Sequence, residues 1–391
     1  MIPDRLNLSK WLNRLLKPPK VQSGFTLIEV LIAAAIGSII ISSLLWLLVN
    51  LVGTERRESA LTDTERDMKR ALDYIVADLK QAVYIYDGGC SLVVTTNVCS
   101  PYFHSDPDTA ANRFLPTWVE EMDNANPDTV PVLAFWKTDP ADTTELDGIT
   151  CATPTYTGAA LDECNNLKRR RYTYSLVVYT QDVPQAGQDW AGQTVIYRQE
   201  IPKYRDADSD GNYYDDFANN RMPGFVDPTD TGVGIFTTWP YILSGTTQCN
   251  LQTNTTTTCA AVDGSLGDSF FPASVRTPVN GTYAQRQVLT DFVDELLPSD
   301  LTDADTTCPS ADYRLTTLSN NNTAVSTDDT AILSRTFYAC VRSSTASVGQ
   351  NQDVILFLRG NAKGRSGTET DLRTAVLQTR VTLRGIIDKE P

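Results

Sequence analysis

Residues 25–52 read FTLIEVLIAAAIGSIIISSLLWLLVNLV, and Gly24 stands directly before them. A helix of these 28 residues would be ~42 Å long, which exceeds the roughly 30 Å hydrocarbon core of a bilayer. The run is too long for the apolar region of an ordinary signal peptide, and no A-x-A cleavage site follows it. The stretch therefore predicts one membrane-spanning helical segment over residues 25–53.

A basic leader, residues 1–24, precedes this run. It carries five Lys or Arg and one Asp, a net charge of +4, whereas the whole chain of 391 residues has a net charge of −15. Basic flanks stay on the cytoplasmic side of a membrane, so the larger part of the chain is predicted on the far side. That part, at −15 − 4 = −19, excludes nucleic acid as the main partner, which needs a basic surface. The single histidine, His104, excludes a metal site built from several histidines.

Glu29 is an exception inside the apolar run. A carboxylate in the hydrocarbon costs on the order of 2.5–3.5 kcal/mol on insertion scales, so a partner for it is expected. The run contains no Lys or Arg that could be that partner. A free α-amino group at Phe25, created by cleavage after Gly24, would supply the missing cation.

The string from Gly24 to Val30, GFTLIEV, resembles the signature of type IV pilins and type II secretion pseudopilins. The resemblance implies that a prepilin peptidase cleaves after Gly24 and that Phe25 is then N-methylated. It also implies that Glu29 neutralises the N-terminal amine of a neighbouring subunit during filament assembly. The family are structural subunits, so no enzymatic activity is expected.

The helix is predicted to continue beyond the membrane as an amphipathic half over residues 54–86. Apolar residues recur there in steps of four and three, charged residues fill the other positions, and no proline occurs between Lys20 and Pro101. The sequence Asp87-Gly88-Gly89 is the expected end of the helix. A separate soluble helix is the alternative, and the pilin resemblance favours one long helix.

The rest of the chain, residues 87–391, predicts a β-rich globular domain with long loops. Its strand candidates are rich in β-branched and aromatic residues and are bounded by turn formers. The near-continuous apolar run VILFLR predicts a central strand, and the alternating AVLQTRVTLR predicts a strand with one face in solvent. The expected fold class is α+β, with the long N-terminal helix packed on antiparallel β-sheets. The candidates are Val130–Lys137, Tyr172–Thr180, Thr194–Gln199, Val288–Val293, Thr336–Arg342, Val354–Arg359 and Ala375–Arg384.

Eight cysteines in a domain outside the cytosol predict disulfides. Their spacing does not suit zinc, and eight cysteines allow 105 pairings, so sequence alone does not fix the connectivity. Pairing of sequence neighbours is the favoured hypothesis because each pair brackets a polar, loop-like stretch. The pairs are Cys90 with Cys99, Cys151 with Cys164, Cys249 with Cys259, and Cys308 with Cys340.

One acidic stretch, residues 206–216, is the candidate metal site. Oxygen donors at alternate positions followed by a glycine resemble the start of an EF-hand calcium loop. The twelfth position is Phe217 rather than glutamate, so an aspartate inside the loop would have to close the site. Calcium is the candidate ligand, and a solvated acidic turn is the alternative. The candidate ligating residues are Asp206, Asp208, Asp210, Asn212 and Asp215.

A basic run, Lys168-Arg169-Arg170-Arg171, stands out on an acidic chain. It could dock an acidic subunit surface or an anionic glycan. The favoured interpretation is a solvated entry to the strand that follows.

The size of the chain and the segment ERDMKRALDYIVADLKQAVYIYD resemble the J-type minor pseudopilins. The resemblance is closer to the hormogonium polysaccharide secretion pseudopilins of filamentous cyanobacteria. The segments that carry it are Ser23–Glu29, Arg56-Arg57-Glu58, Ala71–Asp87, Pro131–Lys137, Tyr174–Tyr179, Asp291–Asp294 and Leu358–Ala362.

This resemblance implies a minor subunit of a type IV pilus-like filament that supports polysaccharide secretion and gliding. The implied partners are the prepilin peptidase, other pilin-like subunits, an inner-membrane assembly platform and the exported polysaccharide. The implied location is the plasma membrane with a periplasmic C-terminal domain, and the cell surface after assembly. A pilus-tip adhesin or glycan-binding subunit and a type II secretion pseudopilin for protein export stay open as alternatives.

Overall fold

The computed structural model describes residues 24–87, 90–94, 96–99, 129–184, 187, 189–206, 211–217, 220–222, 225, 227–229, 236, 241–244, 247–250, 286–317, 334–343 and 351–386. The chain divides into two compact units, residues 1–56 and residues 57–391. In the first unit, the described residues from Leu27 onward form the beginning of one long helix. The second unit contains the rest of that helix and all the strands.

Helix α2 (Leu27–Leu79) is 53 residues long, and its end differs from the prediction. Residues 54–86 were expected to be helical, but the helix stops at Leu79 and strand β1 (Ala82–Ile85) follows after a two-residue turn. The reason is tertiary pairing: Tyr84 and Ile85 lie opposite Trp136 and Phe135 in the neighbouring strand. Aromatic and β-branched side chains favour such a strand over a last helical turn.

The second half of α2 buries one face, as the apolar periodicity predicts. Between Ala60 and Leu79 the buried positions follow one another mainly in steps of three and four residues, which is the repeat of an amphipathic helix. Apart from the buried Asp78, the charged residues of this stretch are exposed or half-exposed. The buried apolar residues of this face are Ala60, Met68, Ala71, Leu72, Ile75 and Leu79.

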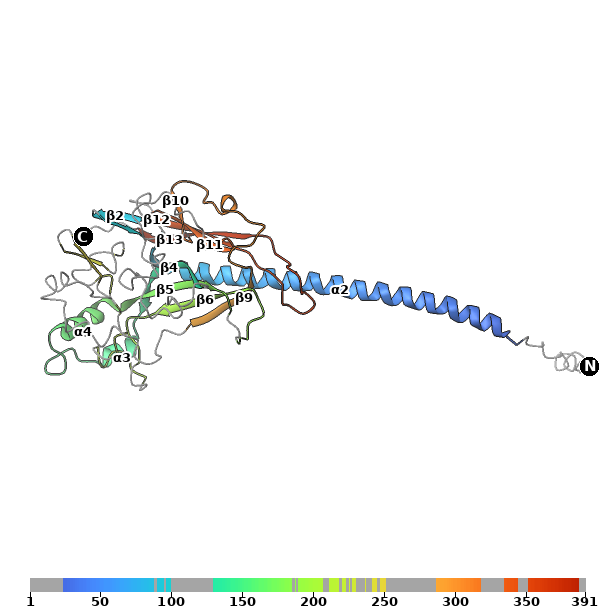
Figure 1. Cartoon of the computed structure of the whole chain (residues 1–391). Coiled ribbons are helices and arrows are strands. Elements are labelled where there is room, and N and C mark those ends of the chain that lie inside the picture. Colours follow the sequence, from blue (N-terminus) through green and yellow to red (C-terminus); the bar gives the residue numbers. More distant parts are fainter. Residues whose placement is uncertain are drawn as a thin grey trace, which may run out of the picture. The chain divides into compact units, whose positions relative to one another are not determined.

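The larger sheet contains five antiparallel strands in the order β1-β4-β5-β6-β9. Figure 1 labels β4, β5, β6 and β9 of this sheet. Two of its three inner strands, β4 and β5, are long and mostly buried, which explains their dense apolar sequences. All four strands after β1 were predicted, within a few residues at each end. Their bounds are β4 Thr129–Pro140, β5 Tyr172–Asp182, β6 Thr194–Ile201 and β9 Arg286–Val293.

The smaller sheet contains four antiparallel strands in the order β10-β11-β12-β13. The prediction of a central strand is confirmed, because β12 lies between two partners. On the edge strand β13, Val381 and Leu383 are buried while Arg380 and Thr382 are exposed, so the predicted alternation is also confirmed. The bounds are β10 Tyr313–Leu315, β11 Phe337–Arg342, β12 Asn351–Leu358 and β13 Leu377–Ile386.

One hydrophobic core joins the helix to both sheets. It contains Met68 and Ile75 from α2, Phe135 from the larger sheet and Phe337 and Leu356 from the smaller sheet. All five of these side chains are fully buried. The expected α+β fold, a long N-terminal helix packed on antiparallel sheets, is thus observed.

A side-chain amide connects the two sheets where β1 approaches the smaller sheet. The Ile85 N–H donates to Gln352 Oε1 (3.1 Å), and Gln352 Nε2 donates to the Ile85 carbonyl (2.7 Å). Gln352 is almost fully buried, so both halves of its amide are satisfied by the backbone of the edge strand. The side-chain amide of Gln352 thus makes with Ile85 of β1 the two hydrogen bonds that the backbone of a neighbouring strand would otherwise make.

A second connection between the sheets involves Asp291–Asp294 and Leu358–Ala362, two of the segments that carry the resemblance to the cyanobacterial pseudopilins. The two segments are hydrogen-bonded to each other. Asn361 N–H donates to the Phe292 carbonyl (2.8 Å), and Asp294 N–H donates to the Arg359 carbonyl (3.1 Å). The fully buried Asp294 carboxylate forms an ion pair with Arg359 (2.7 Å) and accepts a hydrogen bond from Asn361 Nδ2 (2.9 Å). These segments are therefore structural, and they hold the ends of β9 and β12 together.

Several smaller elements lie outside the two large sheets. Two hairpins consist of β2 with β3 and β7 with β8, and a 3-10 turn, η4 (Asp303–Asp305), precedes β10. Two helices, α3 and α4, follow β4 and were not predicted, because their sequences are short and mostly polar. The bounds are β2 Cys90–Val94, β3 Thr96–Cys99, α3 Thr143–Gly148, α4 Ala159–Arg170, β7 Tyr241–Ser244 and β8 Thr247–Asn250.

Two of the four predicted disulfides are present in the described part of the chain. They are Cys151–Cys164 and Cys308–Cys340, with Cα–Cα distances of 5.7 and 5.6 Å. The first ties α4 to the preceding loop, and the second ties the segment before β10 to β11. Each therefore joins two neighbouring elements of the second unit.

The other two predicted disulfides involve cysteines that are only partly described. Cys90 and Cys99 are backbone register partners in the β2–β3 hairpin, but their side chains are outside the described part. Cys249 belongs to β8, whereas Cys259 lies outside the described residues. The structure therefore does not show the predicted bond between Cys249 and Cys259, and both of these disulfides stay predictions.

The Gly360 contact with α2 gives a direct test of the helix packing. A Cβ at Gly360 would lie 2.7 Å from Thr64 Cγ2 and 2.9 Å from Met68 Cγ. We expect Gly360→Ala to lower the free energy of unfolding by about 1–3 kcal/mol, the usual cost of overpacking a core. Chemical denaturation of the full-length protein in detergent measures it.

The matched control is Gly148→Ala, at the last residue of α3, where a Cβ would meet nothing within 4 Å. We expect this change to be neutral or slightly stabilising. Equal stability of the Gly360→Ala variant and the wild type would contradict the close packing described here.

Candidate functional site

The N-terminal segment carries the predicted processing and assembly residues. Gly24, Phe25 and Thr26 are not helical, and α2 begins at Leu27. The Thr26 N–H donates to Glu29 Oε2 (3.2 Å), and the Glu29 N–H donates to Thr26 Oγ1 (3.3 Å). This reciprocal pair is a capping box, in which each residue satisfies a free backbone donor of the first helical turn.

Glu29 thus has its first partner within its own chain. The Thr26 hydroxyl also donates to the carboxylate (3.2 Å), and an acidic side chain in the first turn is favoured by the helix dipole. The expectation of a cationic partner from the Phe25 amine overlooked Thr26. The sequence contains the signal, because Thr26-x-x-Glu29 is the spacing of a capping box. Pairing with a neighbouring subunit's amine stays a prediction.

The apolar run that follows this cap is exposed, because no other described segment of the chain packs over it. The exposed fraction is 83 % for Phe25, 84 % for Leu27 and 70 % for Trp46. By length and composition, α2 is suited to crossing a membrane, and none of its most apolar stretch is buried. So much exposed apolar surface requires either lipid or other helices around it.

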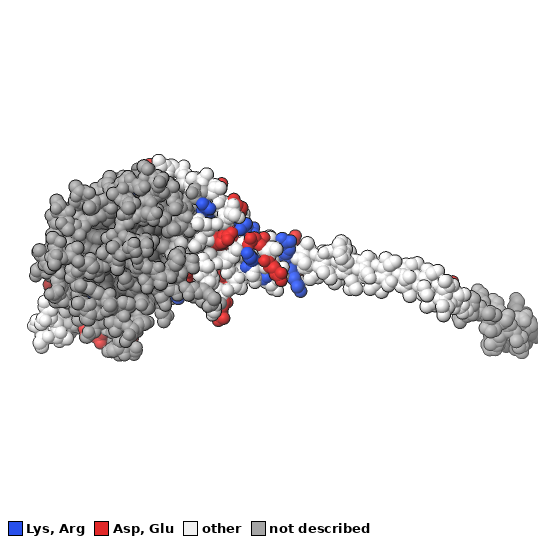
Figure 2. Space-filling view, in the orientation of Figure 1, with Lys and Arg blue, Asp and Glu red and all other residues white. Residues whose placement is uncertain are grey.

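A band of charge follows the run along α2 (Figure 2). Two exposed pairs, Asp63–Arg66 (3.6 Å) and Asp67–Arg70 (3.8 Å), lie on the helix surface and stabilise it little. The change from an apolar surface to a charged one marks the place where the helix would leave the hydrocarbon. The first four charged residues of the band are Glu55, Arg56, Arg57 and Glu58.

The comparisons with known proteins agree with this N-terminal arrangement. Residues 19–45 match the family described as the prokaryotic N-terminal methylation motif. The match includes the predicted cleavage position, the capping box and most of the apolar run. No curated protein and no solved structure matches the chain.

These findings support a subunit of the pilin-like type. The motif implies processing by a prepilin peptidase and assembly with other pilins, and the exposed helix suggests membrane anchoring. Pilin-like proteins of this type are structural subunits. The polysaccharide-related branch rests on the sequence resemblance alone.

The aspartate loop at residues 206–216 is only partly described. Asp206 Oδ2 accepts a hydrogen bond from the Gly211 N–H (2.9 Å), which draws the two ends of the loop together. Asp215 Oδ1 accepts from Asn220 Nδ2 (2.7 Å), so that oxygen already has a protein partner. Asn212 is in the described part, whereas Asp208 and Asp210 lie outside it. Among the described residues no group of three or more His, Cys, Asp or Glu could hold a metal ion.

The basic run at residues 168–171 is largely exposed and directly precedes β5, as predicted, but it is also the end of a helix that was not predicted. Lys168, Arg169 and Arg170 form the last turn of α4, where positive charge is favoured by the helix dipole. Arg171 adopts a left-handed backbone conformation (φ 59°) that ends the helix, and it pairs with Asp147 (2.8 Å). Helix α4 was not predicted because its mostly polar sequence gives a weak periodic signal.

A buried ionic cluster connects the end of α2 to the larger sheet. Asp78 accepts from Arg198 Nε (2.6 Å) and from the Tyr179 hydroxyl (2.7 Å). Arg198 also pairs with Glu200 (2.6 Å), and Glu200 pairs with Lys137 (2.6 Å). Burial would raise the pKa of Glu200, but the hydrogen bonds from Lys137 and Arg198 hold that pKa below its ordinary value.

The pKa of Asp139, at the rim of this cluster, is shifted in the opposite direction to that of Glu200. Burial, together with the nearby Glu200, raises the pKa of Asp139 to about 6 despite the favourable charge of Lys137 (3.3 Å). The Ser175 hydroxyl donates to the same carboxylate. The cluster therefore holds more carboxylate than its two cations stabilise, and Asp139 is the carboxylate that is left with the least support.

A pH dependence follows for the stability of this unit. The ordinary pKa of aspartate is about 3.9, so ionising Asp139 is harder in the folded state, and its contribution to stability falls as pH rises from about 4 to about 6. We expect the stability of Asp139→Asn relative to wild type to increase over that range and to level off above it. Urea unfolding of both proteins between pH 4 and pH 8 measures the difference.

Asp63→Asn, which removes an exposed carboxylate of α2, is the control for the loss of one negative charge. A stability difference between Asp139→Asn and wild type that is independent of pH would contradict the raised pKa.

Proposed function

We propose that this protein is a minor pilin-like subunit, or pseudopilin, of a type IV pilus-like filament that supports polysaccharide secretion and gliding motility. The observation that carries the proposal is the methylation motif at residues 19–45, placed on a capped, exposed apolar helix that continues into a large two-sheet unit. The secretion and motility roles rest on the resemblance of the sequence to hormogonium polysaccharide secretion pseudopilins.

The proposed processing step uses the non-helical residues in front of α2. Gly24 is exposed and a Cβ there would meet nothing within 4 Å, so the peptide bond after it is open to a peptidase. Cleavage removes the basic leader and leaves the apolar helix in the chain. Methylation then modifies the new amine of Phe25, one residue before the helix cap.

The proposed assembly step exchanges lipid for neighbouring helices. The exposed apolar side chains of residues 25–52 can leave the bilayer at little cost in free energy if other subunits cover them. A buried polar pair then fixes the axial register, as a single polar residue does in a coiled coil. In this proposal the pair is Glu29 and the amine of the next subunit, with the assembly platform driving insertion and the second unit lying in the periplasm.

Two substitutions separate the charge of Glu29 from its role in the capping box. Glu29→Gln retains the capping geometry, because glutamine serves at this position of the box, whereas Glu29→Ala removes both. We expect both variants to insert and to be cleaved, and both to incorporate poorly into filaments. Sheared filaments from complemented cells, quantified by immunoblotting against the membrane fraction, give the measurement.

Normal incorporation of Glu29→Gln would refute the charge pairing and leave Glu29 with a capping role only. Normal incorporation of Glu29→Ala would remove Glu29 from assembly altogether.

The exported substrate is tested by deleting the gene in its own host. The proposal expects loss of released polysaccharide and of gliding with unchanged secretion of proteins, and recovery on complementation with the wild-type gene. Loss of protein secretion with normal polysaccharide release would instead identify a type II secretion subunit.

We also propose that the aspartate loop binds calcium, which the alternation of Asp206, Asp208 and Asp210 supports. Mutual repulsion of the carboxylates destabilises the empty loop, so calcium at a hundredfold excess over Kd should stabilise the protein by about 2.7 kcal/mol. Magnesium should do less, because it requires tighter octahedral geometry. Thermal melts of the full-length protein in calcium, magnesium and chelator measure the shift.

Asp208→Asn should abolish the calcium-dependent shift, and Asp147→Asn, an acid of α3 that pairs with Arg171, is the control. Identical melting of the wild type in calcium and in chelator would leave only the solvated acidic turn.

A further inference from the structure

A buried lysine, Lys203, lies between two carboxylates in the second unit. Its Nζ is 2.6 Å from Asp227 Oδ2 and 2.6 Å from Glu163 Oε1. Lys203 is only 4 % exposed and Asp227 only 2 %, although lysine and aspartate are rarely buried so fully. The glutamate belongs to α4, whereas the lysine and the aspartate lie in the segment that follows β6. The fold therefore brings one amine and two carboxyl groups into direct contact away from solvent.

The Asp227 carboxyl group is oriented by hydrogen bonds from Thr229. Its Oδ1 accepts from the Thr229 N–H (2.8 Å) and from the Thr229 hydroxyl (2.6 Å), while its Oδ2 accepts from Lys203 Nζ. Because a C–O bond is about 1.2 Å long, Nζ lies within ~4 Å of the carboxyl carbon, Asp227 Cγ. Reacting atoms are roughly 3–3.5 Å apart in a geometry that is ready for attack. Two donors on Oδ1 would also stabilise the negative charge that this oxygen gains when an amine adds to Cγ.

Glu163 lies where a proton carrier is needed. Its Oε1 faces Lys203 Nζ and accepts a hydrogen bond from the Tyr204 hydroxyl (2.5 Å). Burial would raise the pKa of each carboxyl group, but the charge of Lys203 holds the pKa of Glu163 and that of Asp227 below the ordinary values. Two carboxylates thus share one ammonium group, so one of them can accept a proton from Nζ while the other reacts.

A small polar cavity of about 80 Å³ opens beside these groups. Glu163, Lys203 and Asp227 all line it, together with the hydroxyl-bearing Thr173 and Thr229. A water molecule occupies ~30 Å³ in the liquid and needs polar partners when it is buried. The cavity therefore has room for a water molecule that is released at Lys203.

We propose that Lys203 and Asp227 form an intramolecular isopeptide bond, with Glu163 as the catalytic acid–base residue. The bond between Nζ and Cγ forms, and the bond between Cγ and Oδ2 breaks. The ammonium group loses two protons: one crosses the direct hydrogen bond to Oδ2, and Glu163 carries the other to the same oxygen. That oxygen leaves as water, so the step needs no oxidant, reductant or further reactant. The product amide is neutral and replaces two buried charges, whose desolvation is costly.

The bond closes the chain from residue 203 to residue 227 into a ring that contains the aspartate loop. A covalent ring restricts the unfolded chain, as a disulfide does, and therefore stabilises the folded state. Cys164, the residue after Glu163, is already linked to Cys151. Both cross-links hold the same small core around α4, to which Cys164 and Tyr204 belong. The isopeptide bond lies wholly in the second unit and is independent of processing at the N-terminus.

The test is a peptide map of the full-length protein, purified in detergent, reduced and digested with trypsin. We expect the peptides that contain Lys203 and Asp227 to appear as one branched species, lighter than their sum by one water molecule. Trypsin should not cleave after Lys203, because its amine is blocked. Lys137 is the internal control, since it also lies between two carboxylates, but those of Asp139 and Glu200 are 28 % and 26 % exposed. Water reaches them, so we expect the Lys137 peptide to be unlinked.

Two substitutions assign the roles. Glu163→Gln should slow bond formation about a hundredfold or more, the usual contribution of general acid–base catalysis, as measured by pulse-chase of newly synthesised protein. Asp162→Asn, which removes the exposed neighbouring acid of α4, is the matched control and should form the bond normally. Lys203→Arg retains the cation without a reactive amine and should leave the Asp227 peptide unlinked.

The wild-type map decides the bond even where a variant does not fold. Unlinked Lys203 and Asp227 peptides at full yield would overturn the proposal and leave a buried ion pair. A link from Lys203 to Glu163 would overturn the assignment of Asp227 as the reacting carboxyl group. Equal linking of Lys137 would overturn the role of the buried geometry, and an equal rate in Glu163→Gln and wild type would overturn the role of Glu163.

Discussion

The packing of one face of α2 against two sheets is the constraint on which the rest of the second unit depends. Met68, Leu72 and Ile75 lie in the same core as strands of both sheets, so neither sheet has a complete core without the helix. The connections at Gln352 and Asp294 are then needed only to fix the edges of the sheets. Because the helix is continuous, the element that organises this unit also carries the apolar run.

The two halves of α2 place different demands on their surroundings. The second half is amphipathic, and the chain itself buries its apolar face. The first half is apolar on all sides and exposed, so its cover must come from lipid or from other chains. The capping box of Thr26 and Glu29 allows such a helix to begin with a carboxylate whose oxygen is already hydrogen-bonded. This makes Glu29 less costly in a single chain than its position in the apolar run suggests.

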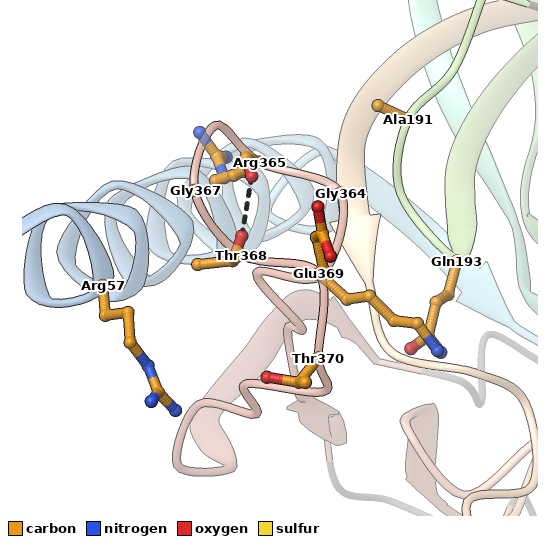
Figure 3. Close-up of a pocket in the computed structure, with 10 residues that line it drawn as sticks. Arg57, Ala191, Gln193, Gly364, Arg365, Gly367, Thr368, Glu369 and Thr370 are labelled. Carbon is orange, nitrogen blue, oxygen red and sulfur yellow. Dashed lines mark hydrogen bonds between the residues drawn. The ribbon is translucent and has the colours of Figure 1, made fainter. Parts of the chain in front are cut away.

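Sequence patterns predicted the fold wherever periodicity is long or the strands are apolar. The alternating β13 and the continuous β12 are examples, because burial on one face or two dictates their residues. The end of α2 was missed because pairing of Tyr84 and Ile85 with β4 is a long-range effect. Helix α4 was missed because its mostly polar sequence gives a weak periodic signal. A pocket lined by Arg57 and by residues 363–370 brings together segments more than 300 positions apart, and no local sequence pattern predicts it (Figure 3).

The central claim is that the N-terminus is processed as a prepilin. The most direct measurement is the intact mass and N-terminal peptide of the protein purified from cells that contain an active prepilin peptidase. The account predicts a chain that begins at Phe25 and carries one methyl group on its amine. A chain that still begins at Met1 in those cells, or that is cut on the far side of the apolar run, would contradict it.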